Sequence, residues 1–174
     1  MIQFRSTTSH AETHLVSEAP LLSVQQLQKT YQTRRDTFTA FTNLNLQIYA
    51  GEVVCLLGAS GCGKSSLLLT IAGLQRASQG AIFLQGNRME MPHPEVGLVF
   101  QQATLLPWLT VWQNIAFGLQ LKQMSRLSDL EVRSCISTAI AGVHLQGFER
   151  NYPHQLSGGM AQRVSLARVL ARQP

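Results

Sequence analysis

The chain has 174 residues, of which 45% are hydrophobic, and a formal net charge of +5. This length favours one domain, and the apolar content is sufficient for a folded core. No apolar run reaches the roughly 18–20 residues of a membrane-spanning helix, and the basic residues are scattered, so we expect neither a transmembrane segment nor nucleic-acid binding.

The first twenty residues are polar and contain no apolar block of signal-peptide length. We therefore expect a mobile extension over 1–20 and a chain that stays in the cytoplasm.

Two strands are expected next. Leu21–Leu27 predicts a first strand, and Tyr31 follows in a polar stretch. Thr39–Tyr49 alternates apolar and polar residues and predicts a half-buried second strand. The two strands predict an antiparallel patch.

The segment Gly58–Ser65 matches the pattern G-x-x-x-x-G-K-[ST] at every fixed position. It follows Val53–Leu57, an apolar run that predicts a buried parallel strand. A helical pattern then continues to Gly73. Strand, glycine-rich loop and helix in this order predict a phosphate site, because loop N–H groups and the positive end of the helix converge on an anion. A glycine-rich turn without a ligand is disfavoured, because motif and flanks agree.

Three side chains of this loop have predicted roles. The Lys64 ammonium is expected to reach the β- and γ-phosphates of a nucleotide, and the Ser65 hydroxyl is expected to bind Mg²⁺. Cys62 is expected to lie beside the bound triphosphate, so alkylation of its thiol should block ATP binding.

The whole chain has three cysteines and no CxxC pattern, which disfavours both disulfides and a zinc site.

Beyond the loop, Ala81–Leu84 predicts a strand, whereas the two prolines of Met91–Pro94 exclude helix and central strand. Val96–Phe100 predicts a second buried strand that ends at Gln101.

Two helices are expected next, over Val111–Lys122 and Asp129–Ala141, with Ser125 or Ser128 as the start of the second.

The sequence LSGGM at 156–160 then precedes another helix, for which Ser157 is a good N-cap. Taken alone, this pattern predicts only a capped helix. Downstream of a phosphate loop, it predicts a second helix start that can receive an anion. One face of this helix is expected to be apolar or small: Met160, Val164, Ala167, Leu170 and Ala171.

With these motifs in order, residues 21–174 resemble the ATP-binding subunits of ABC transporters. Gly58–Ser65 resembles Walker A, Gln101 resembles the glutamine of the Q-loop, and 156–160 is similar to the signature LSGGQ. Tyr31 lies where the family has an aromatic residue that stacks on adenine. The resemblance implies an α/β P-loop NTPase core with an N-terminal antiparallel β patch and a helical subdomain at about 103–172.

The resemblance also implies a mechanism. Two such domains sit head to tail, with ATP between Walker A of one and the signature of the other. Lys64 and Gln101 are the implied catalytic residues, and Ser65 and Gln101 the implied Mg²⁺ contacts. The implied nucleotide contacts are Tyr31, Gly58, Ala59, Ser60, Gly61, Cys62, Gly63, Lys64, Ser65, Ser66, Ser157, Gly158 and Gly159.

The implied partners are transmembrane permease subunits, a second ATP-binding subunit and, indirectly, an external solute-binding protein. The implied location is the cytoplasmic face of the membrane, as a peripheral subunit. A finer resemblance is to importers of the nitrate, sulfonate and taurine group, carried by Pro107-Trp108 and by Met160 in place of the signature glutamine. Met160 lacks the polar amide, but the serine and glycines that touch phosphate remain.

Family members continue from the last helix into an apolar strand that ends in Asp and a catalytic Glu, called Walker B. No apolar run of this chain ends in two acidic residues. We therefore expect a fragment without the C-terminal part of the domain, with an incomplete central sheet and poor stability. Two alternatives stay open: a non-catalytic remnant, and a soluble ABC-type ATPase that works without permeases, as in DNA repair or translation.

Overall fold

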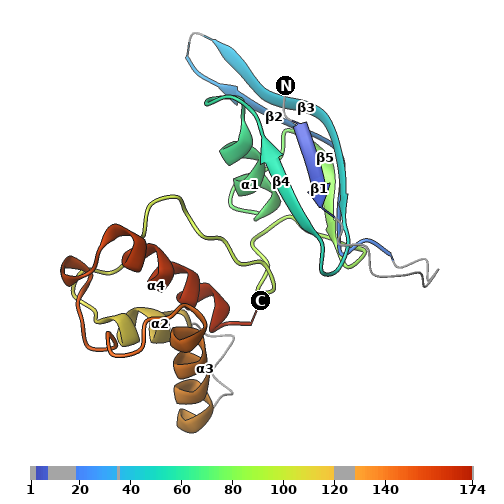
Figure 1. The fold of residues 1–174 in the computed structure, drawn as a ribbon. Helices are drawn as coiled ribbons and strands as arrows, with labels where there is room; N and C mark the ends of the chain where they lie inside the picture. Colours follow the sequence, from blue (N-terminus) through green and yellow to red (C-terminus); the bar gives the residue numbers. More distant parts are fainter. Residues whose placement is uncertain (1–2, 8–18, 35, 120–127, 174) are drawn as a thin grey trace. The chain divides into compact units, whose positions relative to one another are not determined.

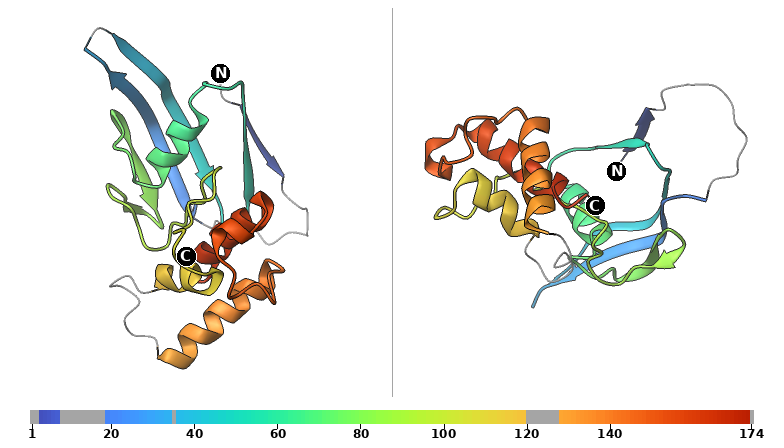
Figure 2. Two further views of the ribbon diagram at one scale, coloured as in Figure 1. Left: turned by 90° about the vertical axis from the view of Figure 1, so that its left-hand side faces the viewer. Right: turned by 90° about the horizontal axis from the view of Figure 1, so that it is seen from below.

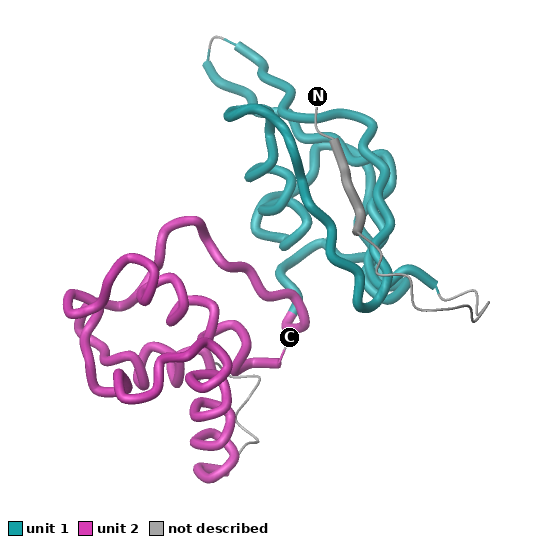
Figure 3. The backbone as a smooth tube through the Cα atoms, in the orientation of Figure 1, with its two compact units in different colours: residues 1–93 teal, residues 94–174 magenta. Residues whose placement is uncertain are grey.

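The computed structural model describes residues 3–7, 19–34, 36–119 and 128–173. The chain forms two compact units, which we call the strand unit (1–93) and the helical unit (94–174) (Figure 3). The helical subdomain expected at about 103–172 falls within the second unit.

A four-stranded antiparallel sheet forms most of the strand unit, in the order β3-β2-β5-β6 (Figure 1). Its strands are β2 (Leu22–Gln32), β3 (Thr37–Ile48), β5 (Gln79–Leu84) and β6 (Asn87–Arg88). The two strands predicted ahead of the phosphate motif are therefore confirmed. β2 runs beyond Leu27, and this longer course places Tyr31 inside the strand.

Helix α1 (Lys64–Ile71) packs against β2, and Figure 2 shows it beside the sheet. Leu67 from the helix and Leu27 from β2 have no exposed surface, and Ile82 from β5 is also buried. Each such buried side chain contributes about 1.5–3 kcal/mol relative to an exposed one. This small core fixes the helix that begins at the phosphate motif.

Strand β4 (Val53–Leu57) pairs antiparallel with β1 (Gln3–Thr7) in a separate two-stranded sheet. The predicted strand is confirmed, but the predicted parallel pairing and burial are wrong, since Val53 is 65% and Leu57 49% exposed. A parallel strand is buried only when neighbouring strands and helices cover both faces. Among the strands that the structure describes, β1 is the only partner of β4. The segment expected as a mobile extension thus contains one strand.

The segment Val96–Phe100 does not form the predicted strand, and none of its residues is fully buried. An apolar run becomes a strand only when a neighbour supplies N–H and C=O partners, and no strand in the described ranges pairs with it. This arrangement agrees with the expected incomplete central sheet.

The helical unit contains α2 (Val111–Leu119), α3 (Asp129–Gly142), the 3-10 helix η2 (Pro153–Gln155) and α4 (Gly158–Leu170). Both predicted helices of the insertion are present, although the end of the first lies outside the described residues. No helix in the described part of the chain is long and apolar enough to cross a membrane. The buried core of this unit comes from all three α-helices and the loop after α3: Val111, Ile115, Leu119, Ile136, Ala139, Ile140, Val143, Leu145, Val164, Ala167 and Ala171.

Ser128 is the N-cap of helix α3, as predicted, and its Oγ accepts a hydrogen bond from the N–H of Glu131 in a capping box. The alternative start, Ser125, lies outside the described residues. The apolar face predicted for α4 is largely confirmed, since Val164, Ala167 and Ala171 are buried and Met160 packs against the core. Leu170 is wrongly included, because it is 47% exposed.

Candidate functional site

The phosphate loop is shaped by two glycines in left-handed conformations, Gly61 (φ +79°) and Gly63 (φ +97°). A Cβ atom on Gly63 would lie 2.7 Å from the carbonyl oxygen of Ala40 in β3, so position 63 has no room for a side chain. Between the glycines, the N–H of Cys62 donates to the carbonyl of Ala59 at 3.3 Å. The loop is therefore a tight turn that glycine makes possible at both points.

Helix α1 follows directly, with Gly63 as N-cap, no side-chain cap and no acidic residue in its first turn. The first N–H groups of a helix have no partner within the helix and carry its positive dipole end. This helix start is therefore suited to an anion. The Ser65 hydroxyl lies in the same turn on an exposed residue.

The Lys64 ammonium lies against its own loop. Its Nζ donates to the carbonyls of Gly58 at 2.6 Å and Ala59 at 2.8 Å, and lies 3.6 Å from Sγ of Cys62. A phosphate group in the loop would replace one of these carbonyls as the partner of the ammonium. The donors gathered here, N–H groups and an ammonium, fit a polyphosphate.

Tyr31 connects β2 to this helix. Its hydroxyl lies 2.7 Å from Oε1 of Gln75 and 3.0 Å from Oγ of Ser66, which is two residues after Lys64. The ammonium of Lys29 lies 4.9 Å from the centre of the Tyr31 ring. The structure thus brings the predicted adenine-stacking residue next to the predicted phosphate site.

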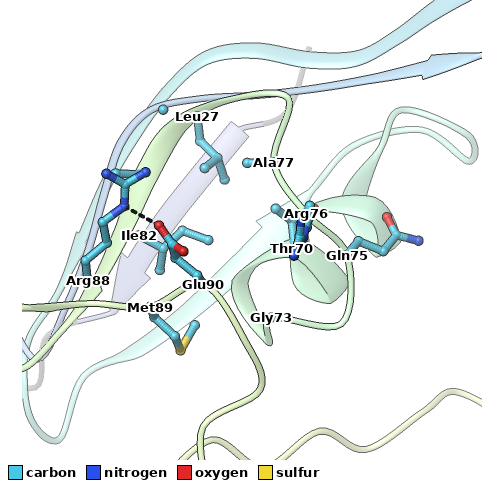
Figure 4. Close-up of a pocket in the computed structure, with 12 residues that line it drawn as sticks. Leu27, Thr70, Gly73, Gln75, Arg76, Ala77, Ile82, Arg88, Met89 and Glu90 are labelled. Atoms are coloured by element: carbon cyan, nitrogen blue, oxygen red, sulfur yellow. Dashed lines mark ion pairs between the residues drawn. The ribbon is translucent and has the colours of Figure 1, made fainter.

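A cavity of about 260 Å³ lies elsewhere in the strand unit (Figure 4). Its lining includes Leu27, Ile82 and Gln75, and an ion pair of 3.1 Å between Arg88 Nε and Glu90 Oε1 lies beside it. No residue of the phosphate loop lines this cavity. None of the predicted nucleotide contacts lines the cavity, although Gln75, the partner of the Tyr31 hydroxyl, does.

In the helical unit, Gln101 is exposed, and the segment around it is held by α4. Nε2 of Gln162 donates to the carbonyl of Phe100 at 2.7 Å. The guanidinium of Arg168 donates to the carbonyl of Thr104 at 2.9 Å and to its Oγ1 at 3.0 Å. Sequence reasoning missed these two side chains, because nothing in the pattern of α4 indicates which loop it contacts.

The signature segment begins α4 as predicted, with Ser157 as N-cap and its Oγ accepting from the N–H of Met160 at 3.2 Å. Gly158 and Gly159 are exposed, and a Cβ atom on either would meet nothing within 4 Å. The backbone of this first turn is therefore accessible to a ligand, as an anion site requires.

The predicted site residues thus form two groups. Tyr31 and residues 58–66 lie in the strand unit, whereas Gln101 and Ser157–Gly159 lie in the helical unit. The described residues contain no cluster of three or more His, Cys, Asp or Glu side chains that could hold a metal ion. The predicted Mg²⁺ contacts are instead a hydroxyl, from Ser65, and an amide, from Gln101.

Residues 41–174 match the ABC transporter family. The chain belongs to this family. It is 40% identical over 153 residues to an aliphatic sulfonates import ATP-binding protein of Bacillus cereus, covering 88% of this chain and 59% of the relative. It is 43% identical over 158 residues to a putrescine transport ATP-binding protein of Escherichia coli, covering 89% of this chain and 40% of the relative.

Among solved structures, the chain is similar to a dimeric ATP-binding cassette in a post-hydrolysis state bound to ADP and phosphate, with a TM-score of 0.76 and 30% identity. The match covers 88% of this chain and 70% of that one. The family resemblance and the ABC-type fold are thereby confirmed. This ABC chain spans about half the length of the curated relatives it matches.

Proposed function

We propose that this chain is the ATP-binding part of an ABC importer, in which binding and hydrolysis of ATP drive solute uptake. The observation that carries the proposal is the phosphate loop, with its two left-handed glycines, its uncapped helix start and the Lys64 ammonium already placed over the loop. These features lie in a chain of the ABC transporter family.

The residues of the strand unit have distinct roles in this proposal. The loop N–H groups hold the phosphates, and Lys64 exchanges its contact with the Gly58 or Ala59 carbonyl for phosphate oxygen. The Ser65 hydroxyl would hold Mg²⁺, which would supply positive charge to the phosphate oxygens. The Tyr31 ring stacks on the base.

The helical unit supplies groups that act in an assembled pair. Ser157, Gly158 and Gly159 of one copy contact the γ-phosphate held by the other copy. The Ser157 oxygen accepts from the N–H of Met160 in the structure, which leaves its O–H available to donate to that phosphate. Gln101 orients the attacking water, and the α2–α3 region docks on the permease at the cytoplasmic face of the membrane. The similarity to a dimeric cassette supports this pairing.

The proposed solute is a small compound of the nitrate, sulfonate and taurine class, whose members share a nitrate or sulfonate group. The Pro107-Trp108 sequence, Met160 and the 40% identity to a sulfonate import protein support this class. A polyamine is the second candidate, because the putrescine transport protein is 43% identical over a similar stretch.

Binding of Mg-ATP to the purified chain tests the nucleotide site. We expect Lys64→Ala to weaken binding by about 100-fold, because it removes a charged donor to the phosphates. Arg133→Ala, which removes an exposed positive charge from α3, should leave the affinity within about twofold. Equal affinities of the wild type and Lys64→Ala would reject the proposed site.

Growth of the source organism tests the transport role and the solute class. A chromosomal Lys64→Ala substitution should abolish growth on an alkanesulfonate as sole sulfur source and spare growth on sulfate. Loss of putrescine uptake instead would favour the polyamine candidate. Normal uptake of all these solutes, with the protein absent from the membrane fraction, would favour the soluble ATPase alternative.

A further inference from the structure

We propose that Gln75 is a positioning residue, which fixes the Tyr31 ring for the base of a bound nucleotide and ties it, through Ser66, to the phosphate loop. This inference rests on the proposed ATP-binding function. It adds Gln75, Ser66 and Lys29 as supports for the base, a role that the family signature does not assign to them.

The hydrogen bonds around the Tyr31 hydroxyl have a definite direction. Oε1 of Gln75, 2.7 Å away, can only accept, so the tyrosine O–H donates to it. The tyrosine oxygen is then free to accept from the Ser66 hydroxyl at 3.0 Å. The result is a chain from Ser66 through Tyr31 to Gln75 in which each bond polarises the next.

The faces of the Tyr31 ring are not equivalent. Lys29 lies two residues earlier on β2 and therefore on the same side of the sheet. Its ammonium lies 4.9 Å from the ring centre and also donates to the carbonyl of Arg76 at 2.7 Å. This cation covers one ring face, so the opposite face is the one on which a base can stack.

Two residues that follow α1, Gln75 and Arg76, bind the groups that position the Tyr31 ring. Gln75 binds the hydroxyl through its side chain, and Arg76 binds the Lys29 ammonium through its carbonyl. The backbone N–H of Gln75 in turn donates to the carbonyl of Leu69 in α1. The ring is thus held from the same helix whose first turn begins the phosphate site.

This arrangement couples two parts of a nucleotide. The phosphates would bind at the start of α1, and Ser66 lies in that first turn. Hydrogen bonds of its hydroxyl with Ser66 and Gln75 keep the Tyr31 ring at a constant distance from the phosphate loop. Removing the bond to Gln75 should therefore weaken binding of the base and leave binding of the phosphates unchanged.

Calorimetric titration of the chain with Mg-ATP and with Mg-tripolyphosphate separates these contributions. For Gln75→Ala, we expect the affinity for ATP to fall about fivefold, the effect of one lost hydrogen bond, while the affinity for tripolyphosphate stays constant. Gln75→Glu keeps an acceptor oxygen and should recover most of the ATP affinity.

Two further variants guard against a purely structural explanation. Tyr31→Phe keeps the ring but lacks the hydroxyl, and should match Gln75→Ala. The double variant should show no further loss, because both substitutions remove the same bond. Gln28→Ala, in the same strand but bonded to the Thr30 and Thr42 hydroxyls, should affect neither ligand.

The outcomes distinguish this inference from the proposed function. Equal losses for ATP and tripolyphosphate in Gln75→Ala would overturn the positioning role and show a structural one. An unchanged ATP affinity would also overturn it, while the ATP site stands. If the wild-type chain binds neither ligand, the proposed function fails and the inference fails with it.

Discussion

The phosphate loop and the segment around Gln101 are both irregular, but they are held in different ways. The phosphate loop is held by itself, through two left-handed glycines and the Lys64 ammonium on its own carbonyls. The segment Phe100–Thr104 is held from outside, by Gln162 and Arg168 of a helix more than sixty residues later. The first loop should therefore respond most to changes in backbone freedom, and the second to the loss of distant side chains.

The strongest test of this difference is Gly63→Ala in the phosphate loop. The substitution forces a side chain into a backbone conformation with φ of +97° and places its Cβ 2.7 Å from the Ala40 oxygen. We expect the loop to shift and the affinity for Mg-ATP to fall by about 100-fold, since the N–H groups no longer converge. Calorimetric titration measures the change.

Gly61→Ala is the matched control, because Gly61 is also left-handed (φ +79°) but has nothing within 4 Å of the new Cβ. Gly61→Ala should cost only the free energy of placing a side chain on a left-handed residue, about 1–2 kcal/mol, which lowers the affinity for Mg-ATP roughly tenfold. Equal losses for the two variants would show that crowding against β3 has no part in the site.

The same difference explains what could be predicted from sequence. The phosphate loop, its helix and the Ser157 cap depend on residues a few positions apart, so a local pattern contains the necessary information. The exposure of β4 and the absence of a strand at Val96–Phe100 depend on which neighbours are available. An apolar run shows that a segment is hydrophobic but not which strand it pairs with. The predicted burial of β4 and the predicted strand at Val96–Phe100 were therefore both wrong, whereas β4 itself was correctly predicted as a strand.

The contacts of Gln162 and Arg168 were not predictable for a related reason. Each is a side chain that binds the backbone of an irregular segment, and such segments have no repeating pattern to match. Tyr31 was placed only by family resemblance, and its partners Ser66 and Gln75 follow from the pairing and packing of β2 and α1.

Asn114 of α2 also holds an irregular segment, the turn at residues 106–110, and its loss should affect the stability of the helical unit. Its side chain is fully buried. Its two amide N–H groups are shared among the carbonyls of Leu106, Leu109 and Thr110, and its Oδ1 accepts from the N–H of Leu106. Asn114→Ala removes the side-chain partner of the Leu106 N–H and of the Leu109 carbonyl, whereas the carbonyls of Leu106 and Thr110 keep the N–H groups of Leu109 and of residue 114. We expect the substitution to lower the free energy of unfolding by about 2–4 kcal/mol. Denaturant titration of the helical signal measures this loss.

The neighbouring substitution Gln113→Ala serves as the control for Asn114. Gln113 is exposed and accepts one hydrogen bond from the N–H of Thr110, so its loss should cost about 0.5–1 kcal/mol. If the two variants were equally stable, the buried amide would not hold the 106–110 turn.

Arg168→Lys tests the tether of the Gln101 segment directly. Lysine keeps the charge but lacks the planar fork that binds both the carbonyl and the hydroxyl of Thr104. Burial lowers the pKa of Arg168, but an arginine remains charged at neutral pH. We expect a loss of about 1 kcal/mol and faster hydrogen exchange in Phe100–Thr104, with exchange in the phosphate loop unchanged.

Arg163→Lys is the control for this tether, because Arg163 binds the carbonyls of Val143 and His144 at the end of α3. Faster exchange should then appear near position 144 and leave Phe100–Thr104 unaffected. Identical exchange patterns for the two variants would contradict a specific role of Arg168 in holding the Gln101 segment.

The smallest expected effect is a pH response at the start of α3, where a side chain again holds backbone. The backbone N–H and the hydroxyl of Ser128 both donate to the Glu131 carboxylate at 2.7 Å, and these bonds lower the pKa of Glu131. Because the folded state favours the charged form, this support is complete above the ordinary pKa of a glutamate side chain and is lost as pH falls through the lower folded pKa. Hydrogen exchange in the first turn of α3 should therefore accelerate only in acid.

Two variants control for this pH response. In Glu131→Gln the exchange rate should no longer depend on this titration, and in Ser128→Ala the midpoint pH of the acceleration should rise. An unchanged midpoint in Ser128→Ala would show that the capping box does not set the charge state of Glu131.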